Sequence, residues 1–199
     1  MKFFLRLLIV FTFFGCTNRQ EKLPFLGNPI VNGKDTLYPK IADFSFVNQD
    51  SISVTNKTFE KKIYVADFIF LSCPTICPKM NAELTKVFQV YKNNPDVLFL
   101  SHTIDPERDT VERLKLYTSS KNINENWHFV TGNKDSIYNI ATKSYFATAY
   151  KDAKEPGGYV HSGGFLLVDK NRHIRGVYDG TNEEETKRLI RDIKILLTE

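Results

Sequence analysis

Several features that would assign a chain to a special class are scarce or missing in this 199-residue sequence. Cysteine occurs three times, which is too few for the disulfide framework of a small secreted domain. The 27 Lys and Arg residues outnumber the 23 Asp and Glu residues only slightly and are dispersed, so no nucleic-acid partner is indicated. Internal repeats and low-complexity tracts are absent from the sequence. With 42% hydrophobic and 25% charged residues, the composition is typical of one globular domain.

The amino terminus has the pattern of a signal peptide. The basic residues Lys2 and Arg6 precede the apolar run Leu7–Phe14, and the small residue Gly15 follows it. The eight residues of that run are less than half of the ~20 that a membrane-spanning helix needs, so a permanent transmembrane anchor is the weaker interpretation. We therefore predict a signal peptide over residues 1–15.

Cys16 directly follows this segment. The sequence Phe13-Phe14-Gly15-Cys16 resembles the lipobox of bacterial lipoproteins, although the lipobox prefers Leu where Phe13 stands. This resemblance implies lipidation of Cys16 and attachment to a membrane surface outside the cytoplasm, in the bacterial cell envelope. Residues 16–38 are then a lipidated tether and leading loop, and residues 39–199 form the folded domain.

The domain alternates short apolar runs with amphipathic stretches, which predicts an α/β fold. A βαβ unit, a connecting helix, a β-hairpin and a last helix follow one another, as in thioredoxin-like domains. A central mixed sheet flanked by helices is expected, with a β-hairpin at the start of the domain. The expected strands are 41–47, 51–54, 62–71, 97–104, 163–168 and 173–178, and the expected helices are 75–92, 109–120, 133–145 and 182–197.

The most informative motif is Cys73-Pro74-Thr75-Ile76-Cys77-Pro78. It lies between a predicted buried strand and a predicted helix, where unpaired backbone N–H groups lower the pKa of a thiol. Residues four apart share one helix face, with Cβ atoms about 5–6 Å apart. Two sulfurs at that spacing can chelate a soft metal ion, or can close a disulfide if the first turn distorts. Their use as buried apolar fillers is the weaker interpretation.

A site with two thiolates needs a third donor, and the chain has four histidines. His161 lies in a glycine-flanked segment that is predicted to be a loop before a strand. In a thioredoxin-like sheet this loop lies beside the loop of the cysteines, so His161 is the predicted third ligand. His102 and His128 are expected to be partly buried residues with satisfied hydrogen bonds, and His173 is expected to be a solvated strand residue.

Two thiolates and one imidazole are suited to copper, because sulfur holds Cu(I) and nitrogen helps to hold Cu(II). Zinc accepts the same donors. A structural zinc site usually has four protein ligands, however, and no fourth Cys or His is obviously close. Copper is therefore the predicted metal and zinc the alternative.

With these motifs, the chain resembles the Sco/SenC family of copper proteins, which are membrane-attached assembly factors for cytochrome c oxidase. The resemblance covers roughly residues 39–198 and rests on the cysteine motif, on the segment Thr103–Thr110 (TIDPERDT) and on His161-Ser162. It implies copper binding by Cys73, Cys77 and His161. It also implies delivery of copper to the binuclear copper centre of oxidase subunit II, or reduction of the cysteines of that centre. Many members have Asp before the histidine where this chain has Val160, so that source of carboxylate support for His161 is missing.

The segment that begins at Asp105 has a structural explanation as well. Asp105-Pro106 ends a strand, and Asp109 or Thr110 can cap the next helix. Because Asp105 follows a strand that neighbours the cysteine loop, it is also a candidate for orienting the site or a partner.

The leading hypothesis is a metallochaperone rather than an enzyme that turns over substrate. The runner-up is an extracytoplasmic thiol-disulfide oxidoreductase in which Cys73 and Cys77 form the redox pair and His161 only tunes their pKa values. A thiol peroxidase is a weaker third reading, because its expected surroundings are not recognisable. Outside the cytoplasm the cysteine pair tends to oxidise, so an upstream thiol reductant is expected as a partner.

Overall fold

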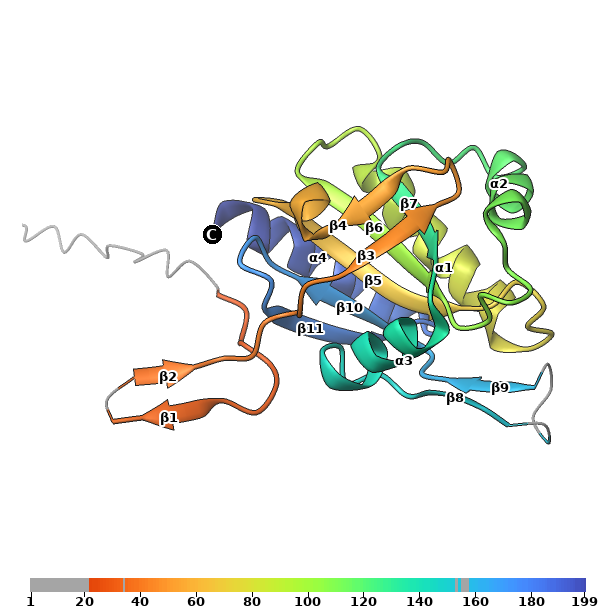
Figure 1. Ribbon diagram of the computed structural model, residues 1–199. Coiled ribbons are helices and arrows are strands. Elements are labelled where there is room, and N and C mark those ends of the chain that lie inside the picture. Colours follow the sequence, from red (N-terminus) through yellow and green to blue (C-terminus); the bar gives the residue numbers. More distant parts are fainter. Residues whose placement is uncertain (1–21, 34, 153, 155–157) are drawn as a thin grey trace, which may run out of the picture.

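A central mixed sheet with helices on both faces forms the body of the protein in the computed structural model, which describes residues 22–33, 35–152, 154 and 158–199 (Figure 1). The strands are β1 (Ile30–Asn32), β2 (Asp35–Leu37), β3 (Ser45–Asn48), β4 (Ser53–Thr55), β5 (Ile63–Ile69), β6 (Val97–Thr103), β7 (Trp127–Thr131), β8 (Ala149–Lys151), β9 (Tyr159–His161), β10 (Gly164–Val168) and β11 (Ile174–Asp179). The α-helices are α1 (Ile76–Tyr91), α2 (Val111–Ser119), α3 (Lys134–Lys143) and α4 (Glu183–Thr198), and the short 3-10 helix η1 spans Asn56–Phe59. The thioredoxin-like fold expected from the sequence is confirmed.

The seven-stranded sheet has the order β11-β10-β5-β6-β7-β3-β4. Strands β5, β6 and β7 run parallel, and the outer strands are antiparallel to their neighbours. Every residue of β5 and β6 is buried, as their continuous apolar runs predict for strands covered on both faces. Ile69 at the end of β5 is level with Thr103 at the end of β6, so the segments that follow the two strands begin side by side.

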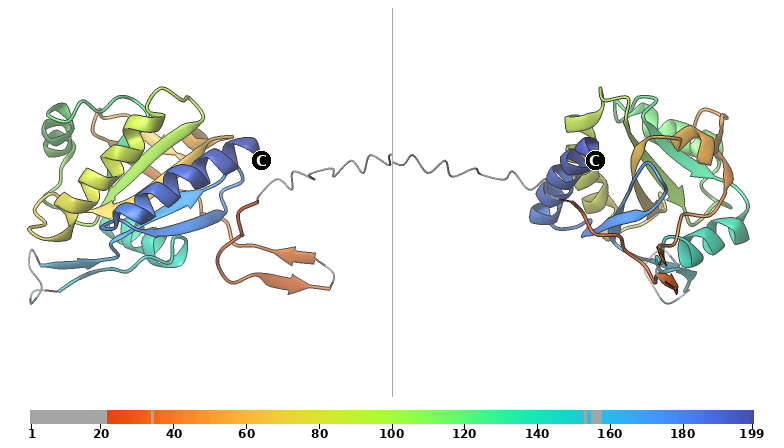
Figure 2. Two further views of the ribbon diagram at one scale, coloured as in Figure 1. Left: turned by 180° about the vertical axis from the view of Figure 1, so that it is seen from behind. Right: turned by 90° about the vertical axis from the view of Figure 1, so that its left-hand side faces the viewer.

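Helices cover the two faces of this sheet unequally. Helices α1 and α4 lie side by side on one face, where their apolar side chains pack on β5, β6 and β10 (Figure 2). Helix α3 covers the other face with Ile137, Ile140 and Ala141. The cysteine pair belongs to the core on the α3 side, although Cys77 is carried by α1.

Two short hairpins lie outside the main sheet. Strands β1 and β2 form one inside the segment expected to be a tether and leading loop, and all six of their residues are exposed. Strands β8 and β9 form the other, next to the predicted site (Figure 1). The hairpin expected at the start of the domain is confirmed as β3 and β4.

The predicted signal peptide and Cys16 lie outside the described residues. Among the described helices, none combines the length and the apolarity needed to cross a bilayer.

Arg175 on β11 fixes the first described residues to the body. Its buried guanidinium donates to the carbonyl oxygens of Leu23 and Pro24 at 2.6 and 3.1 Å. It also donates to Asp169 at 3.0 Å and to Glu199 at 2.7 Å. Because a buried cation needs charged and polar partners on every donor, this cluster determines where the amino-terminal segment joins the domain.

We expect Arg175→Met to lower the free energy of unfolding by about 3 kcal/mol, because Asp169 would stay buried without its cation. Arg172→Met is the matched control. Arg172 lies in the same β-hairpin but pairs with Asp43 at an exposed position, so its loss should cost less than about 1 kcal/mol. Equilibrium urea denaturation measures both values, and equal losses would contradict the assignment of Arg175 as the anchor.

Candidate metal centre

The two cysteines lie where the loop after β5 leads into the first turn of α1. The amide of Cys73 donates to the carbonyl of Phe70 at 3.1 Å, which reverses the chain directly after the strand. Helix α1 begins at Ile76, so Cys77 lies in its first turn. Pro78 follows in the same turn, where its missing N–H would have no helical partner in any case.

The ligand atoms of Cys73, Cys77 and His161 all lie within 4.8 Å of one another, and all three residues are buried. An ion about 2.3 Å from each of two sulfurs holds them at most about 4.6 Å apart, so the three atoms are already spaced to within a few tenths of an ångström of a chelate. Both thiols are free. The structure therefore brings together the three side chains singled out from the sequence.

His161 presents a defined ring nitrogen to the thiols. Its Nδ1 lies 3.1 Å from the carbonyl oxygen of Ser162, and because a carbonyl only accepts, Nδ1 carries the proton. Nε2 is then the nitrogen with a free lone pair, and it lies 3.1 Å from Sγ of Cys77. The backbone of Ser162 thus supplies the orientation that a carboxylate at position 160 would otherwise give.

The segment of His161 was predicted to be a loop, and this is corrected by the structure. Residues Tyr159–His161 form β9, and the amide of Ser162 donates to the carbonyl of Thr148 at 2.8 Å. Glycines near the segment suggested a loop, but backbone pairing with β8 orders it as a strand.

The two thiols have opposite pKa shifts. Burial acts to raise the pKa of Cys73, but hydrogen bonds from the backbone of Cys77 and Thr75, together with their side chains, hold it below its usual value. Burial raises the pKa of Cys77, and the neighbouring Cys73 raises it further. Burial also lowers the pKa of His161. At neutral pH the metal-free site therefore has one activated thiol, one protonated thiol and a neutral imidazole.

Asp109 fixes the loop of the cysteines through hydrogen bonds. Its Oδ2 accepts from the amide of Leu71 at 3.0 Å and from the hydroxyl of Thr103 at 2.6 Å. Arg113 pairs with Asp109 at 3.3 Å and donates to Ser72 at 2.9 Å. Asp109 or Thr110 was expected to cap the helix; the cap is Thr110, and Asp109 instead bonds to the loop. The only sequence signal for this contact was its place in the Asp-Pro-Glu-Arg-Asp-Thr motif.

Asp105 is buried but is not a member of the three-residue group found among the described side chains. Its Oδ1 accepts from the hydroxyl of Tyr159 at 2.8 Å, and its Oδ2 pairs with Arg108. It therefore contacts the strand that carries His161 rather than the sulfurs.

The other histidines lie outside the group. His102 was expected to have satisfied hydrogen bonds, and this was wrong. It is fully buried, neither ring nitrogen has a hydrogen-bond partner among the described residues, and aromatic rings that include Phe46 and Phe68 surround it. Burial lowers its pKa to about 3, so it stays neutral.

His128 is half-buried and bonds to Asn48, as expected. His173 was expected to be a solvated strand residue, but it is half-buried before β11, with Nδ1 3.1 Å from the carbonyl of Pro39.

Asp67 is a buried acid that the sequence analysis did not single out. It lies on β5, accepts from the hydroxyl of Ser101 at 2.6 Å, and has a pKa raised by burial to about 7. Its charge contributes to the raised pKa of Cys77. In the sequence, Asp67 stands out only as an acidic residue within an otherwise apolar predicted strand.

Clefts open on both sides of the cysteine pair. One, of about 200 Å³, is lined by residues that include both cysteines, Tyr117 and Lys121. The other, of about 270 Å³, is lined by residues that include Cys73, Tyr159 and His161. Cys73 lines both clefts, and Cys77 lines the first.

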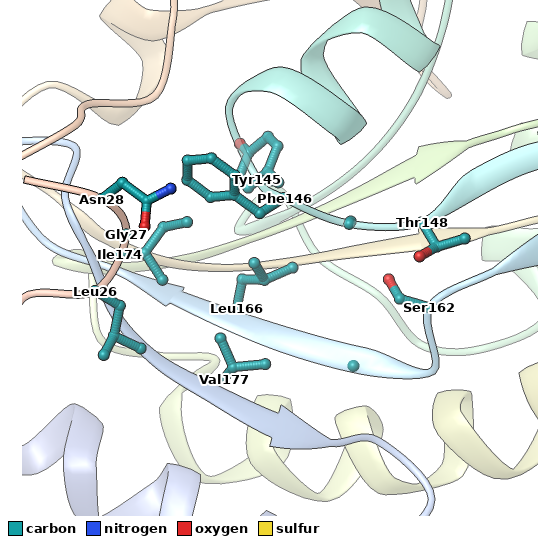
Figure 3. Close-up of a pocket in the computed structure, with 12 residues that line it drawn as sticks. Leu26, Gly27, Asn28, Tyr145, Phe146, Thr148, Ser162, Leu166, Ile174 and Val177 are labelled. Carbon is teal, nitrogen blue, oxygen red and sulfur yellow. The ribbon is translucent and has the colours of Figure 1, made fainter.

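A separate cavity of about 420 Å³ lies between the amino-terminal segment and the end of α3. Apolar side chains such as Leu26, Leu166 and Ile174 form most of its wall, and Thr148 and Ser162 lie at one end (Figure 3). Its described lining residues include no thiol, imidazole or carboxylate, so it is not the reactive site.

Comparisons with known proteins agree with the geometry. The family model described as SCO1/SenC matches residues 33–198. The SCO1 protein homolog of Bacillus subtilis is 34% identical over 164 residues, which cover 81% of this chain and 84% of that protein.

Three solved structures are also similar. A SCO1/SenC family lipoprotein from Bacillus anthracis has a TM-score of 0.73 and 31% identity over 79% of this chain and 95% of that one. BsSco, described as a member of the Sco family of cytochrome c oxidase assembly proteins with a disulfide switch, has a TM-score of 0.71 and 33% identity, covering 83% and 97%. Copper-bound ScoI from Arabidopsis thaliana has a TM-score of 0.64 and 25% identity, covering 77% and 97%.

We expect Cys73 to be the faster-reacting thiol in the reduced, metal-free protein. The thiolate is the nucleophile, so a lowered pKa moves the pH midpoint of alkylation below the ordinary value, and a raised pKa moves that of Cys77 above it. Initial rates of iodoacetamide labelling at each cysteine, followed by mass spectrometry across pH, measure the two midpoints.

Cys77→Ala should raise the midpoint of Cys73 more than Cys77→Ser does, because serine keeps a side-chain donor near Cys73. Equal midpoints for the two thiols of the unaltered protein would contradict the assignment.

Proposed function

The chain belongs to the SCO1/SenC family, and from this we propose that it is a copper metallochaperone that binds the ion through Cys73, Cys77 and His161. The convergence of these three ligand atoms within 4.8 Å is the observation that carries the proposal. The similarity to copper-bound ScoI supports the choice of metal.

The donor set suits an ion that changes oxidation state. Two thiolates favour Cu(I), and the imidazole adds a nitrogen donor that helps to hold Cu(II). A structural zinc site usually has four protein ligands, whereas three side chains meet in this part of the described chain. When copper binds, the proton on Cys77 has to leave, so Nε2 of His161 and the sulfur become available to the ion together.

The recipient we propose is the binuclear copper centre of cytochrome c oxidase subunit II. The description of BsSco as a cytochrome c oxidase assembly protein supports this partner. Copper loading requires the reduced cysteine pair, so an upstream thiol reductant is the second partner.

We propose that the protein is held at a membrane surface outside the cytoplasm, in the bacterial cell envelope, by a lipid on Cys16 after removal of residues 1–15. The signal-peptide pattern supports this, and so does the similarity to a lipoprotein of the same family. Residues 16–38 would then connect the anchor to the domain of residues 39–199.

Thiol-disulfide exchange is the second candidate function, and the opposite pKa shifts of the two thiols favour it. The Cys73 thiolate would attack a partner disulfide, forming a mixed disulfide and releasing one partner thiolate. Cys77, after losing its proton, would attack the Cys73 sulfur, release the second partner thiol and leave the Cys73–Cys77 disulfide. The two electrons come from the cysteine pair, which the upstream reductant then restores.

Replacing either cysteine should abolish copper retention. We expect Cys73→Ser and Cys77→Ser to lose copper during purification, because one thiolate and one imidazole leave the ion short of soft ligands. His128→Ala is the matched control, since it removes a potential metal ligand outside the group and should leave one copper per chain. Metal analysis after gel filtration measures this, and a Cys73→Ser or Cys77→Ser variant that keeps one copper per chain would refute the proposed ligand set.

His161→Ala should separate the two candidate functions. We expect Cu(II) affinity to fall by at least about tenfold, since even loss of an outer-shell partner costs 10–100-fold, while Cu(I) binding is partly retained by the two thiolates. Disulfide exchange should largely survive. His128→Ala is the control, because it removes an imidazole outside the group.

Titration of the reduced protein, followed by the visible thiolate-to-Cu(II) absorption, measures the affinity, and exchange activity is assayed on the same samples. Unchanged Cu(II) affinity in His161→Ala would remove His161 from the site and, with exchange activity retained, would favour the oxidoreductase.

A further inference from the structure

The strand that carries His161 is not part of the main sheet. Among the described strands, β9 pairs only with β8, in a separate two-stranded hairpin at one end of the body (Figure 1). The cysteines, in contrast, follow the central strand β5 directly. In the described part of the chain, the backbone ties His161 to the body only after the strand, through Gly163, whose carbonyl accepts the amide of Gly180 at 2.7 Å. Side-chain contacts between the hairpin and the body therefore contribute to the distance between the imidazole and the sulfurs.

Tyr159, two residues before His161, makes such a contact. Its hydroxyl donates to Oδ1 of Asp105 at 2.8 Å in a buried hydrogen bond that joins residues 54 apart in sequence. Asp105 is itself fixed, because its amide donates to Thr103 at 3.0 Å and its carbonyl accepts from the amide of Asp109 at 2.8 Å.

Ring contacts continue from this bond to the imidazole. The ring of Tyr159 packs against Phe70 with centroids 5.4 Å apart, and Phe70 meets His161 edge to face at 5.6 Å. Phe70 also accepts the amide of Cys73 through its carbonyl. Residues two apart on a strand point to the same face, so Tyr159 and His161 both face the body.

We propose that Tyr159, held by Asp105, is the positioning residue of the copper site: its hydrogen bond docks β9 on the body so that Nε2 of His161 faces Cys77. This inference rests on the proposed function. It also explains how Asp105 could orient the site, namely through its hydrogen bond with Tyr159. Without the bond, the hairpin loses a buried attachment, its backbone pairing opens more often, and the imidazole leaves the position in which it completes the chelate.

Tyr159→Phe tests this with the ring contacts intact. We expect Cu(II) affinity to fall by about tenfold, as for other outer-shell partners of metal ligands. The thiolate-to-Cu(II) absorption should also shift, because the imidazole is no longer held in place. Tyr91→Phe is the matched control: the Tyr91 hydroxyl also donates to a single partner, the carbonyl of Ile190, between α1 and α4. Its loss should leave affinity and spectrum unchanged.

A double-mutant cycle tests the route through Asp105. Asp105→Ala should lower Cu(II) affinity as Tyr159→Phe does. The double variant should bind Cu(II) as tightly as the single variant with the lower affinity, because both substitutions remove the same hydrogen bond. Asp105→Asn keeps an oxygen that can accept from Tyr159 and should restore most of the affinity. Additive losses would overturn the proposal.

Amide hydrogen exchange in the reduced, metal-free protein gives a readout that does not need copper. Tyr159→Phe and Asp105→Ala should speed exchange at Val160, His161 and Ser162, and should leave the amides of β5 and β6 as slow as before. Unchanged exchange together with unchanged Cu(II) affinity would overturn the proposal. If the unaltered protein bound no copper, the proposed function would fail, whereas the exchange rates would still decide whether Tyr159 docks the hairpin.

Discussion

The parallel pairing of β5 with β6 is the constraint on which the rest of the site depends. Because the two strands end level, the segment with the cysteines and the segment with Asp105 and Asp109 leave the sheet side by side. Asp109 can then bond to the amide of Leu71, and Asp105 can reach the hairpin of His161. A slip of this pairing by one residue would turn every side chain of the shifted strand to the other face and would separate these partners.

The site has one rigid half and one attached half. The cysteines are fixed by a central strand, a buried carboxylate and the first turn of α1, whereas the imidazole comes from a two-stranded hairpin held to the body by side chains. Sulfur alone can hold Cu(I), but Cu(II) gains from nitrogen. In the proposed site, Cu(I) therefore depends mainly on the rigid half, and Cu(II) needs the cysteines and the imidazole to be correctly positioned together.

The sequence predicted those parts of the protein whose signals are local. Continuous apolar runs identified β5 and β6, helical spacing identified α1, and the cysteine motif with His161 identified the candidate ligands. The hairpins β1–β2 and β8–β9 were missed because each strand has only three residues, too few for a period. The bond between Tyr159 and Asp105 spans 54 residues, and nothing local marks either residue as its partner. His102 was misjudged because the rule that buried polar atoms find partners has exceptions, here a ring enclosed by other rings.

The cluster around Arg175 has a geometric consequence for how the molecule works. Ile174 pairs with Val168, which pairs with Tyr64 near the start of β5, while Cys73 lies beyond its end. The seven residues of β5, at about 3.3 Å each, separate the cluster around Arg175 from the cysteines by roughly 20 Å. The protein thus has two poles. A membrane anchor that precedes Leu23 would therefore pull on the end of the sheet opposite to Cys73 and Cys77, which leaves the clefts beside the cysteines accessible to an incoming protein.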